Sequence, residues 1–162
     1  MVESGAKFKC NFSKTKSKFY RVANSILCKL GNCDNASATV SLMSSIALPI
    51  LMYAVESLAL NKSELNLLDH PLCRIFEKIF KTFDKNVIKQ CRLYMGNLSF
   101  HQYYSLRVMS FLLGLSTSSN ILLRFIYQNS GHEDIVKLAN RYECTSEIFF
   151  KDYREIILDE HL

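Results

Sequence analysis

The stretch Asn61–Phe83, which reads NKSELNLLDHPLCRIFEKIFKTF, decides the fold class of this sequence. It opens with a capping box, because Asn61 offers an N-cap side chain and Glu64 follows three residues later. Apolar residues then recur at three- and four-residue steps, as on the buried face of a helix: Leu65, Leu68, Leu72, Ile75, Phe76, Ile79, Phe80 and Phe83. Since proline is best tolerated in a first turn, the regular part of this helix is expected to begin near Pro71.

Helical patterns continue toward the C-terminus. A break is expected at Thr82–Asn86, where Asp84 can cap a following helix that ends at Gly96. A second capping box, at Ser99–Gln102, opens an apolar helix that runs to Gly114. Further helices are predicted at about 119–129 and, from a third capping box at residues 130–133, at about 132–142.

Toward the N-terminus, a helix is predicted from Ser13 to the glycine at position 31, where a left-handed cap is expected. Its apolar positions again follow helical spacing: Phe19, Val22, Ala23, Ile26, Leu27 and Leu30. The opposite face carries Lys14, Lys18, Arg21 and Ser25. This leading helix is therefore amphipathic with a basic face.

The run Leu42–Leu60 holds a single charge, Glu56, and is long enough to cross a membrane. Several serines dilute it, no aromatic belt flanks it, and Pro49 would leave a backbone carbonyl unsatisfied in lipid. A buried core helix kinked at Pro49 is the preferred interpretation, and a membrane span is the alternative.

The composition agrees with long helices. Only 5 Gly and 2 Pro punctuate 162 residues, whereas a sandwich or barrel needs frequent turn residues. The sequence therefore predicts an all-α fold, an irregular helical bundle of about six to eight helices. We expect a frayed N-terminal tail at 1–12, the bundle at 13–145, and a C-terminal helix or tail at 146–162.

The net charge of +5 is distributed as a gradient along the chain. Residues 1–33 carry seven Lys and Arg against one Glu, whereas residues 131–162 carry four basic and eight acidic side chains. A basic surface binds polyphosphates favourably through counterion release. The first part of the chain is thus the candidate for nucleic-acid contact, although a solvated basic tail would have the same composition.

A second basic pattern lies in the middle of the chain: Arg74, Lys78, Lys81, Lys85, Lys89 and Arg92. Their spacing of three or four residues would make one cationic stripe about 27 Å long on a continuous helix. Ile75, Ile79, Phe83 and Ile88 would form the apolar face beside it. Such a stripe could track a nucleic-acid backbone, or it could be the solvated side of a core helix, and a break near Asp84 would split it in two.

Sequence signatures of catalysis are missing. The chain has no Asp-Asp dipeptide for two-metal polymerase chemistry, no nucleophile elbow and no phosphate-binding glycine loop. Its six cysteines lie in amphipathic segments without a Cys-x-x-Cys pair or a secretory signal, so we expect reduced thiols in an intracellular protein, cytoplasmic or nuclear. No catalytic residue, metal site or cofactor is predicted for this chain alone.

Three segments, in order and at characteristic separations, resemble the region just after the palm in non-LTR (LINE-type) retrotransposon reverse transcriptases of the CR1 and related lineages. They are Lys18-Phe19-Tyr20 with Asn24-Ser25-Ile26, then Leu48–Glu56, then Phe80–Phe83. The resemblance covers about residues 8–115. It implies a thumb-like helical region of an RNA-directed DNA polymerase, without the fingers, the palm and its aspartate pair, the endonuclease or the zinc knuckle.

The resemblance implies contact with RNA or an RNA–DNA duplex, and the basic segments indicate that phosphates rather than bases would be bound. The predicted binding residues are Lys14, Lys16, Lys18 and Arg21, with a second patch of Arg74, Lys78, Lys81, Lys85, Lys89 and Arg92. Further expected partners are the missing palm domain or a second copy of the chain. The alternatives are a helical protein–protein interaction module and a small membrane protein that spans at residues 42–60.

Overall fold

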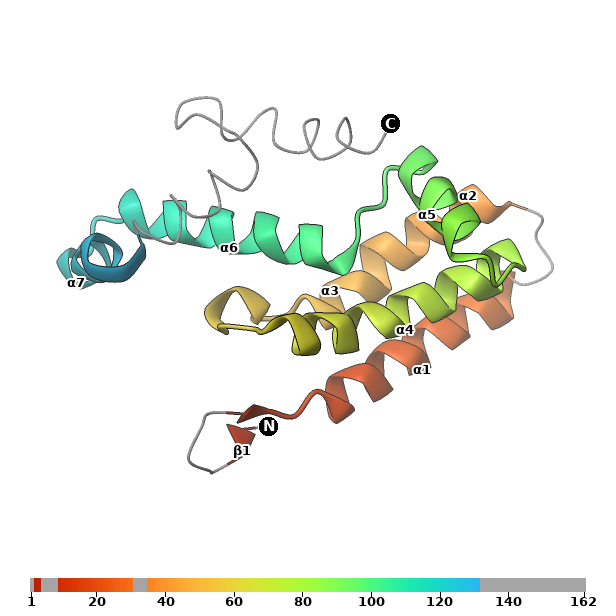
Figure 1. Ribbon diagram of the computed structural model, residues 1–162, viewed down its shortest axis with the longest axis horizontal. Helices are drawn as coiled ribbons and strands as arrows, with labels where there is room; N and C mark the ends of the chain where they lie inside the picture. Colours follow the sequence, from red (N-terminus) through yellow and green to blue (C-terminus); the bar gives the residue numbers. More distant parts are fainter. Residues whose placement is uncertain (1, 4–8, 31–34, 132–162) are drawn as a thin grey trace. The chain divides into compact units, whose positions relative to one another are not determined.

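The structure, a computed structural model, describes residues 2–3, 9–30 and 35–131, and α-helices dominate these residues (Figure 1). The predicted all-α bundle of six to eight helices is confirmed. The glycine cap at position 31, the helix at about 132–142 and the segment 146–162 lie outside the described residues.

The chain separates into two compact units, a division that the sequence does not indicate. Unit 1 comprises Met1–Ala54 and Leu60–Phe100, and unit 2 comprises Val55–Ala59 and His101–Leu162. All of the predicted nucleic-acid-binding residues belong to unit 1.

Unit 1 begins with a short hairpin-like pair of strands and a long helix. Strands β1 (Val2–Glu3) and β2 (Lys9–Cys10) pair antiparallel, where the sequence indicates only a tail. Helix α1 spans Ser13–Leu30, as predicted, and the Asn11 side chain accepts a hydrogen bond from the Ser13 amide at 2.9 Å. This bond satisfies one of the amides that a helix start leaves without a partner.

The next helical run contains a wide turn. Helix α2 (Ala36–Leu42) is capped by Asn35 and continues as the π-helical turn η1 (Met43–Ala47) and helix α3 (Leu48–Leu51). Pro49 stands in the first turn of α3, where its missing amide is tolerated. The helical hydrogen-bond pattern is interrupted in the wide turn, just before Pro49. The helix can therefore continue past the proline to Leu51.

The predicted core helix through Leu60 is too long, because α3 ends at Leu51 and a turn with Ala54 at positive φ follows. The buried side chains of this run are core residues: Val40, Met43, Ala47, Leu48 and Leu51. Residues Ala36–Ser57 nevertheless have the length and composition of a membrane span. Length and composition alone do not separate a buried core helix from a span.

Helix α4 spans Lys62–Phe80 and begins with the predicted capping box. The Glu64 amide donates to the Asn61 side chain, and the Asn61 amide donates to the Glu64 carboxylate, both at 2.9 Å. The helix thus starts well before Pro71, which lies buried inside it, so the expected displacement of the helix start to Pro71 is wrong. The two reciprocal bonds fix the start at Asn61, and the proline is accommodated within the core.

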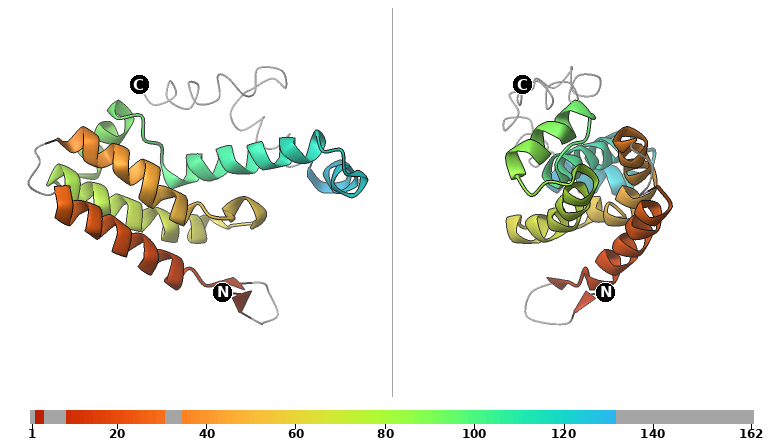
Figure 2. Two further views of the ribbon diagram at one scale, coloured as in Figure 1. Left: turned by 180° about the vertical axis from the view of Figure 1, so that it is seen from behind. Right: turned by 90° about the vertical axis from the view of Figure 1, so that its right-hand side faces the viewer.

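Helix α1 packs against η1, α3 and α4, and both views in Figure 2 show α1 and α4 side by side. Helix α5 (Lys85–Tyr94) packs on α4 after a short loop, and the Asp84 side chain caps it as predicted. The core of unit 1 is completed by large buried side chains of these helices and of the segment after α5: Phe19, Leu68, Leu72, Ile75, Phe76, Ile88, Leu98 and Phe100.

Unit 2 contains the 3-10 turn η2 (Val55–Ser57), helix α7 (Ile121–Ile126), the π-helical turn η3 (Tyr127–Gly131), and all but the first residue of helix α6 (Phe100–Ser116). Within it, the Tyr104 hydroxyl donates to the Leu58 carbonyl at 2.7 Å. Asn120 caps α7, which lies inside the helix predicted at about 119–129.

Candidate nucleic-acid interface

The two predicted basic segments meet at the seam between α1 and α4. The Lys78 ammonium donates to the Asn24 side-chain oxygen at 3.2 Å. One turn earlier on α1, burial raises the pKa of the Tyr20 hydroxyl. The positive charge of Arg74 lowers this pKa, and the negative charge of Glu77 raises it. The Tyr20–Asn24 edge of α1 therefore runs along the Arg74–Lys78 edge of α4.

This seam brings cations of both helices together. Arg21 precedes Asn24 by three residues and is exposed, so it lies on the neighbouring position of the helix surface. Lys14 and Lys18 continue the exposed side of α1 at the same spacing. Arg21 from α1 and Lys78 from α4 thus flank the same asparagine, although they are far apart in the sequence.

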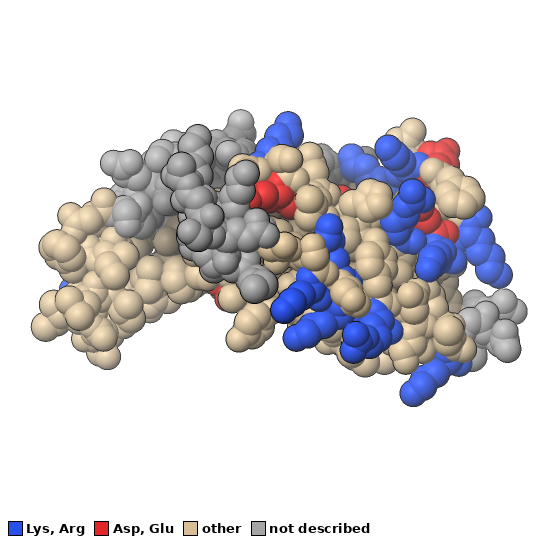
Figure 3. Space-filling model, turned by 90° about the horizontal axis from the view of Figure 1, so that it is seen from below, with Lys and Arg blue, Asp and Glu red and all other residues tan. Residues whose placement is uncertain are grey.

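The accessibility of the predicted binding residues follows this arrangement. Most are exposed: Lys14, Lys18, Arg21, Arg74, Lys78, Lys81, Lys85 and Lys89. Lys16 is half-buried, because it lies on the side of α1 nearer the core. Figure 3 shows Lys and Arg side chains gathered on the face seen from below, with fewer Asp and Glu among them.

Several acidic side chains of unit 1 cap helices or form ion pairs. Glu64 and Asp84 serve the caps of α4 and α5, and Glu77 accepts an ion pair from Arg74 at 2.9 Å. By contrast, Lys81, Lys85 and Lys89 form no ion pair with the residues that the structure describes. Because Lys and Arg also outnumber Asp and Glu among the described residues of unit 1, the field of this region is dominated by positive charge.

The helix break predicted at Thr82–Asn86 is confirmed, and the cationic stripe that a continuous helix would carry does not form. Helix α4 ends at Phe80, Lys81 adopts a left-handed conformation with φ of 52°, and α5 begins only at Lys85. The stripe is therefore split, as a break near Asp84 would require. The apolar face expected beside the stripe is also interrupted, because Phe83 is 82% exposed instead of packing with Ile75, Ile79 and Ile88.

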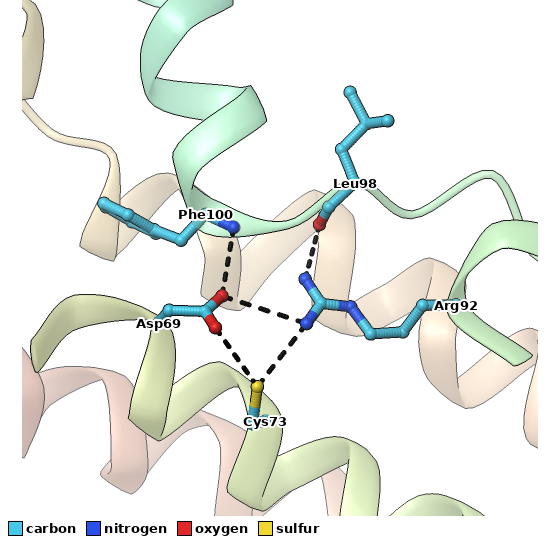
Figure 4. A network of polar contacts seen from close by, with 5 residues as sticks. All are labelled: Asp69, Cys73, Arg92, Leu98 and Phe100. Carbon is cyan, nitrogen blue, oxygen red and sulfur yellow. Dashed lines mark hydrogen bonds and ion pairs between the residues drawn. The ribbon is translucent and has the colours of Figure 1, made fainter. Parts of the chain in front are cut away.

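Arg92 is the predicted binding residue that the structure contradicts. It is only 7% exposed, and its guanidinium lies over the Phe76 ring at 4.9 Å from the centroid. One guanidinium nitrogen donates to the Leu98 carbonyl, and the other donates to the Cys73 sulfur at 3.6 Å (Figure 4). Since both ends of its fork are engaged within the fold, Arg92 cannot reach a phosphate on the surface.

Asp69 completes this network around Arg92. Its Oδ1 atom lies 3.8 Å from the Arg92 guanidinium and accepts a hydrogen bond from the Phe100 amide at 3.0 Å. Its Oδ2 atom accepts from the Cys73 thiol at 3.3 Å. Burial and then the Asp69 carboxylate raise the pKa of Cys73 to about 11, against the opposing effect of Arg92. The network joins α4, α5 and the start of α6, and it holds the thiol proton more tightly than an ordinary cysteine does.

Sequence reasoning did not identify Asn24, Asp69 and Cys73 as contributors. Asn24 carries no charge, so nothing in a charge pattern marks it. Asp69 and Cys73 are four residues apart on one face of α4, a spacing that many surface helices contain. Their significance depends on Arg92, which reaches them from another helix.

Among the described residues, no group of three or more His, Cys, Asp or Glu side chains is placed to hold a metal ion. Comparison of the chain with protein-family models, with curated proteins and with solved structures gave no match.

Proposed function

We propose that this chain binds RNA or an RNA–DNA duplex through phosphate contacts, as a thumb-like region of a LINE-type reverse transcriptase. The observation that carries the proposal is the meeting of Arg21 and Lys78 at Asn24, supported by the Lys78–Asn24 bond of 3.2 Å. Cations from two helices there line one exposed seam, which is the arrangement that a backbone-tracking surface requires. The parent family also supplies the polymerase chemistry, which we do not assign to this chain alone.

Backbone binding has a measurable signature in its salt dependence. We expect the logarithm of the association constant to fall linearly with the logarithm of the salt concentration in a filter-binding titration. Neutralising Lys18, Arg21 and Lys78 to glutamine should lower the magnitude of this slope by about 0.7 to 0.9 for each phosphate that the variant no longer neutralises.

Lys62→Gln is the matched control, because Lys62 is an exposed lysine of unit 1 at the far end of α4. It should leave the slope unchanged. An affinity that stays flat between low and physiological salt would remove the proposal, and equal effects of the control and the triple variant would remove the assignment to the seam.

A second candidate function, a helical protein–protein interaction module, is favoured by helix α7. Ile121, Leu122 and Phe125 of this helix are all well exposed. Large apolar side chains gathered in solvent commonly mark a contact surface. Sedimentation over a concentration series tests whether the chain self-associates: a strict monomer, unchanged by Phe125→Ser, would count against self-association.

A further inference from the structure

The loop between α4 and α5 presents an aromatic ring to solvent among lysines. Phe83 is 82% exposed, and the neighbouring Lys81 and Lys85 are exposed as well. Lys89 lies one turn beyond Lys85 on the same side of α5. An apolar ring in water carries an unfavourable hydration free energy, and here a lysine lies two positions away on each side of it, with the carboxylate of Asp84 adjacent.

The loop that carries Phe83 is held by hydrogen bonds on both sides. The Lys81 and Thr82 amides both donate to the Glu77 carbonyl, the second at 3.3 Å, and so close the end of α4. The Asp84 amide donates to the Thr82 hydroxyl at 3.3 Å, and the Asn86 amide donates to the Asp84 carboxylate at 2.8 Å. The backbone on each side of Phe83 is therefore fixed before any ligand arrives, which reduces the entropic cost of binding.

Lys81, the C-cap of α4, adds backbone strain at one end of this loop. It occupies the left-handed region with φ of 52°, a position where glycine or asparagine would be less strained. Strained non-glycine residues concentrate at binding and catalytic sites. The strained residue is also a lysine that lies two positions from the exposed ring.

Tyr94 is an exposed aromatic residue that does not lie among the lysines near Phe83. It is 86% exposed and also belongs to α5. Helical spacing places it with Val87 and Gln90, away from the side that carries Lys85 and Lys89. Exposure alone therefore does not distinguish Phe83, whereas exposure among lysines does.

We propose that Phe83, with Lys81, Lys85 and Lys89, is a stacking site for an unpaired base of a single-stranded nucleic acid. An unpaired base can lie flat on the ring while the lysines contact the phosphates on either side of it. A duplex hides the faces of its bases, so this site selects single strands or the unpaired end next to a duplex. The inference rests on the proposed function, since it specifies which form of nucleic acid occupies part of the same basic surface.

Fluorescence of a single introduced tryptophan tests the stacking directly. The chain contains no Trp, so Phe83→Trp places the only indole at the site. Titration with a uridine decamer should quench this fluorescence, whereas Tyr94→Trp should show little change. A decamer of abasic spacers, which keeps the phosphates and lacks the bases, should bind Phe83→Trp more weakly and leave its fluorescence unquenched.

Affinity measurements separate stacking from simple apolar contact. Phe83→Leu keeps the apolar bulk without a π-face and should weaken uridine decamer binding by about tenfold, whereas Phe83→Tyr should bind like the parent chain. Both variants change a solvent-exposed side chain, so folding should be preserved.

The outcomes distinguish the two proposals. Decamer binding with normal salt dependence, but without quenching of Phe83→Trp or weakening in Phe83→Leu, would overturn the stacking site and leave phosphate binding in place. Absence of salt-dependent binding to any of the nucleic acids would overturn both.

Discussion

Lys89 and Arg92 lie three residues apart on α5, yet they occupy opposite environments. Lys89 is exposed and forms no ion pair with the described residues, whereas Arg92 is buried against Phe76 and Asp69. Both belong to the same run of cations in the sequence. A cation at helical spacing can therefore either be available to bind a ligand or stabilise the fold. The group that its side chain contacts decides between these two roles.

The largest effect on the free energy of unfolding is expected when Arg92, the buried cation of this pair, is replaced. Arg92→Ala should lower the free energy of unfolding by about 3 kcal/mol, because Asp69 would lose its buried counterion and Phe76 its cation–π partner. Lys89→Ala, the outward counterpart in the same helix, should change it by less than about 0.5 kcal/mol. Urea denaturation measures both, and equal destabilisation by the two variants would break the comparison.

A smaller effect of opposite sign is expected at Lys81, an outward cation held in a strained conformation. Lys81→Gly should raise the free energy of unfolding by up to about 1 kcal/mol, because glycine adopts positive φ without the Cβ clash. Lys81→Gln removes the same charge but keeps the strain, so it should not stabilise the chain. A gain in both variants would show that charge repulsion, and not the backbone, destabilises this position.

A further effect depends on pH and concerns the thiol that Arg92 and Asp69 enclose. Burial raises the pKa of Cys73 from 9.0 to about 11, so the folded state holds its proton more tightly than the unfolded state does. This contribution to stability is complete below about pH 9 and is lost as the pH rises toward 11. Between about pH 9 and pH 11, the free energy of unfolding of the parent chain should therefore fall relative to that of Cys73→Ala. Denaturation series at increasing pH measure this difference. A difference that stays constant with pH would contradict this coupling.

Local signals made the fold partly predictable. The caps at Asn61 and Asp84 depend on residues two or three positions away, and both form as expected. The end of α3 at Leu51 was missed, because apolar residues continue to Leu60 and periodicity alone does not mark where a helix stops. The wide turn at Met43–Ala47 likewise has no local sequence signature.

The candidate site was predictable only in its composition. The exposed cations of α1, α4 and α5 could be chosen from spacing, but Arg92 could not be excluded in this way. On a continuous helix, Arg92 would share the face of Arg74; the break after Phe80 instead gives α5 its own rotation, which Ile88 sets by packing into the core. The meeting of α1 and α4 at Asn24 depends on tertiary packing, which the spacing of charges does not report.

The wide turn before Pro49 has a consequence for changes in chain length. A single π-helical turn accommodates one residue more than an α-helical turn does, so Met43–Ala47 can be regarded as an insertion that the fold has already absorbed. Deleting Ser45 would return this segment to α-helical winding, whereas deleting a residue within regular α1 would rotate every later side chain of that helix by about 100°. We therefore expect that this segment can be shortened by one residue while α2 and α3 remain continuous.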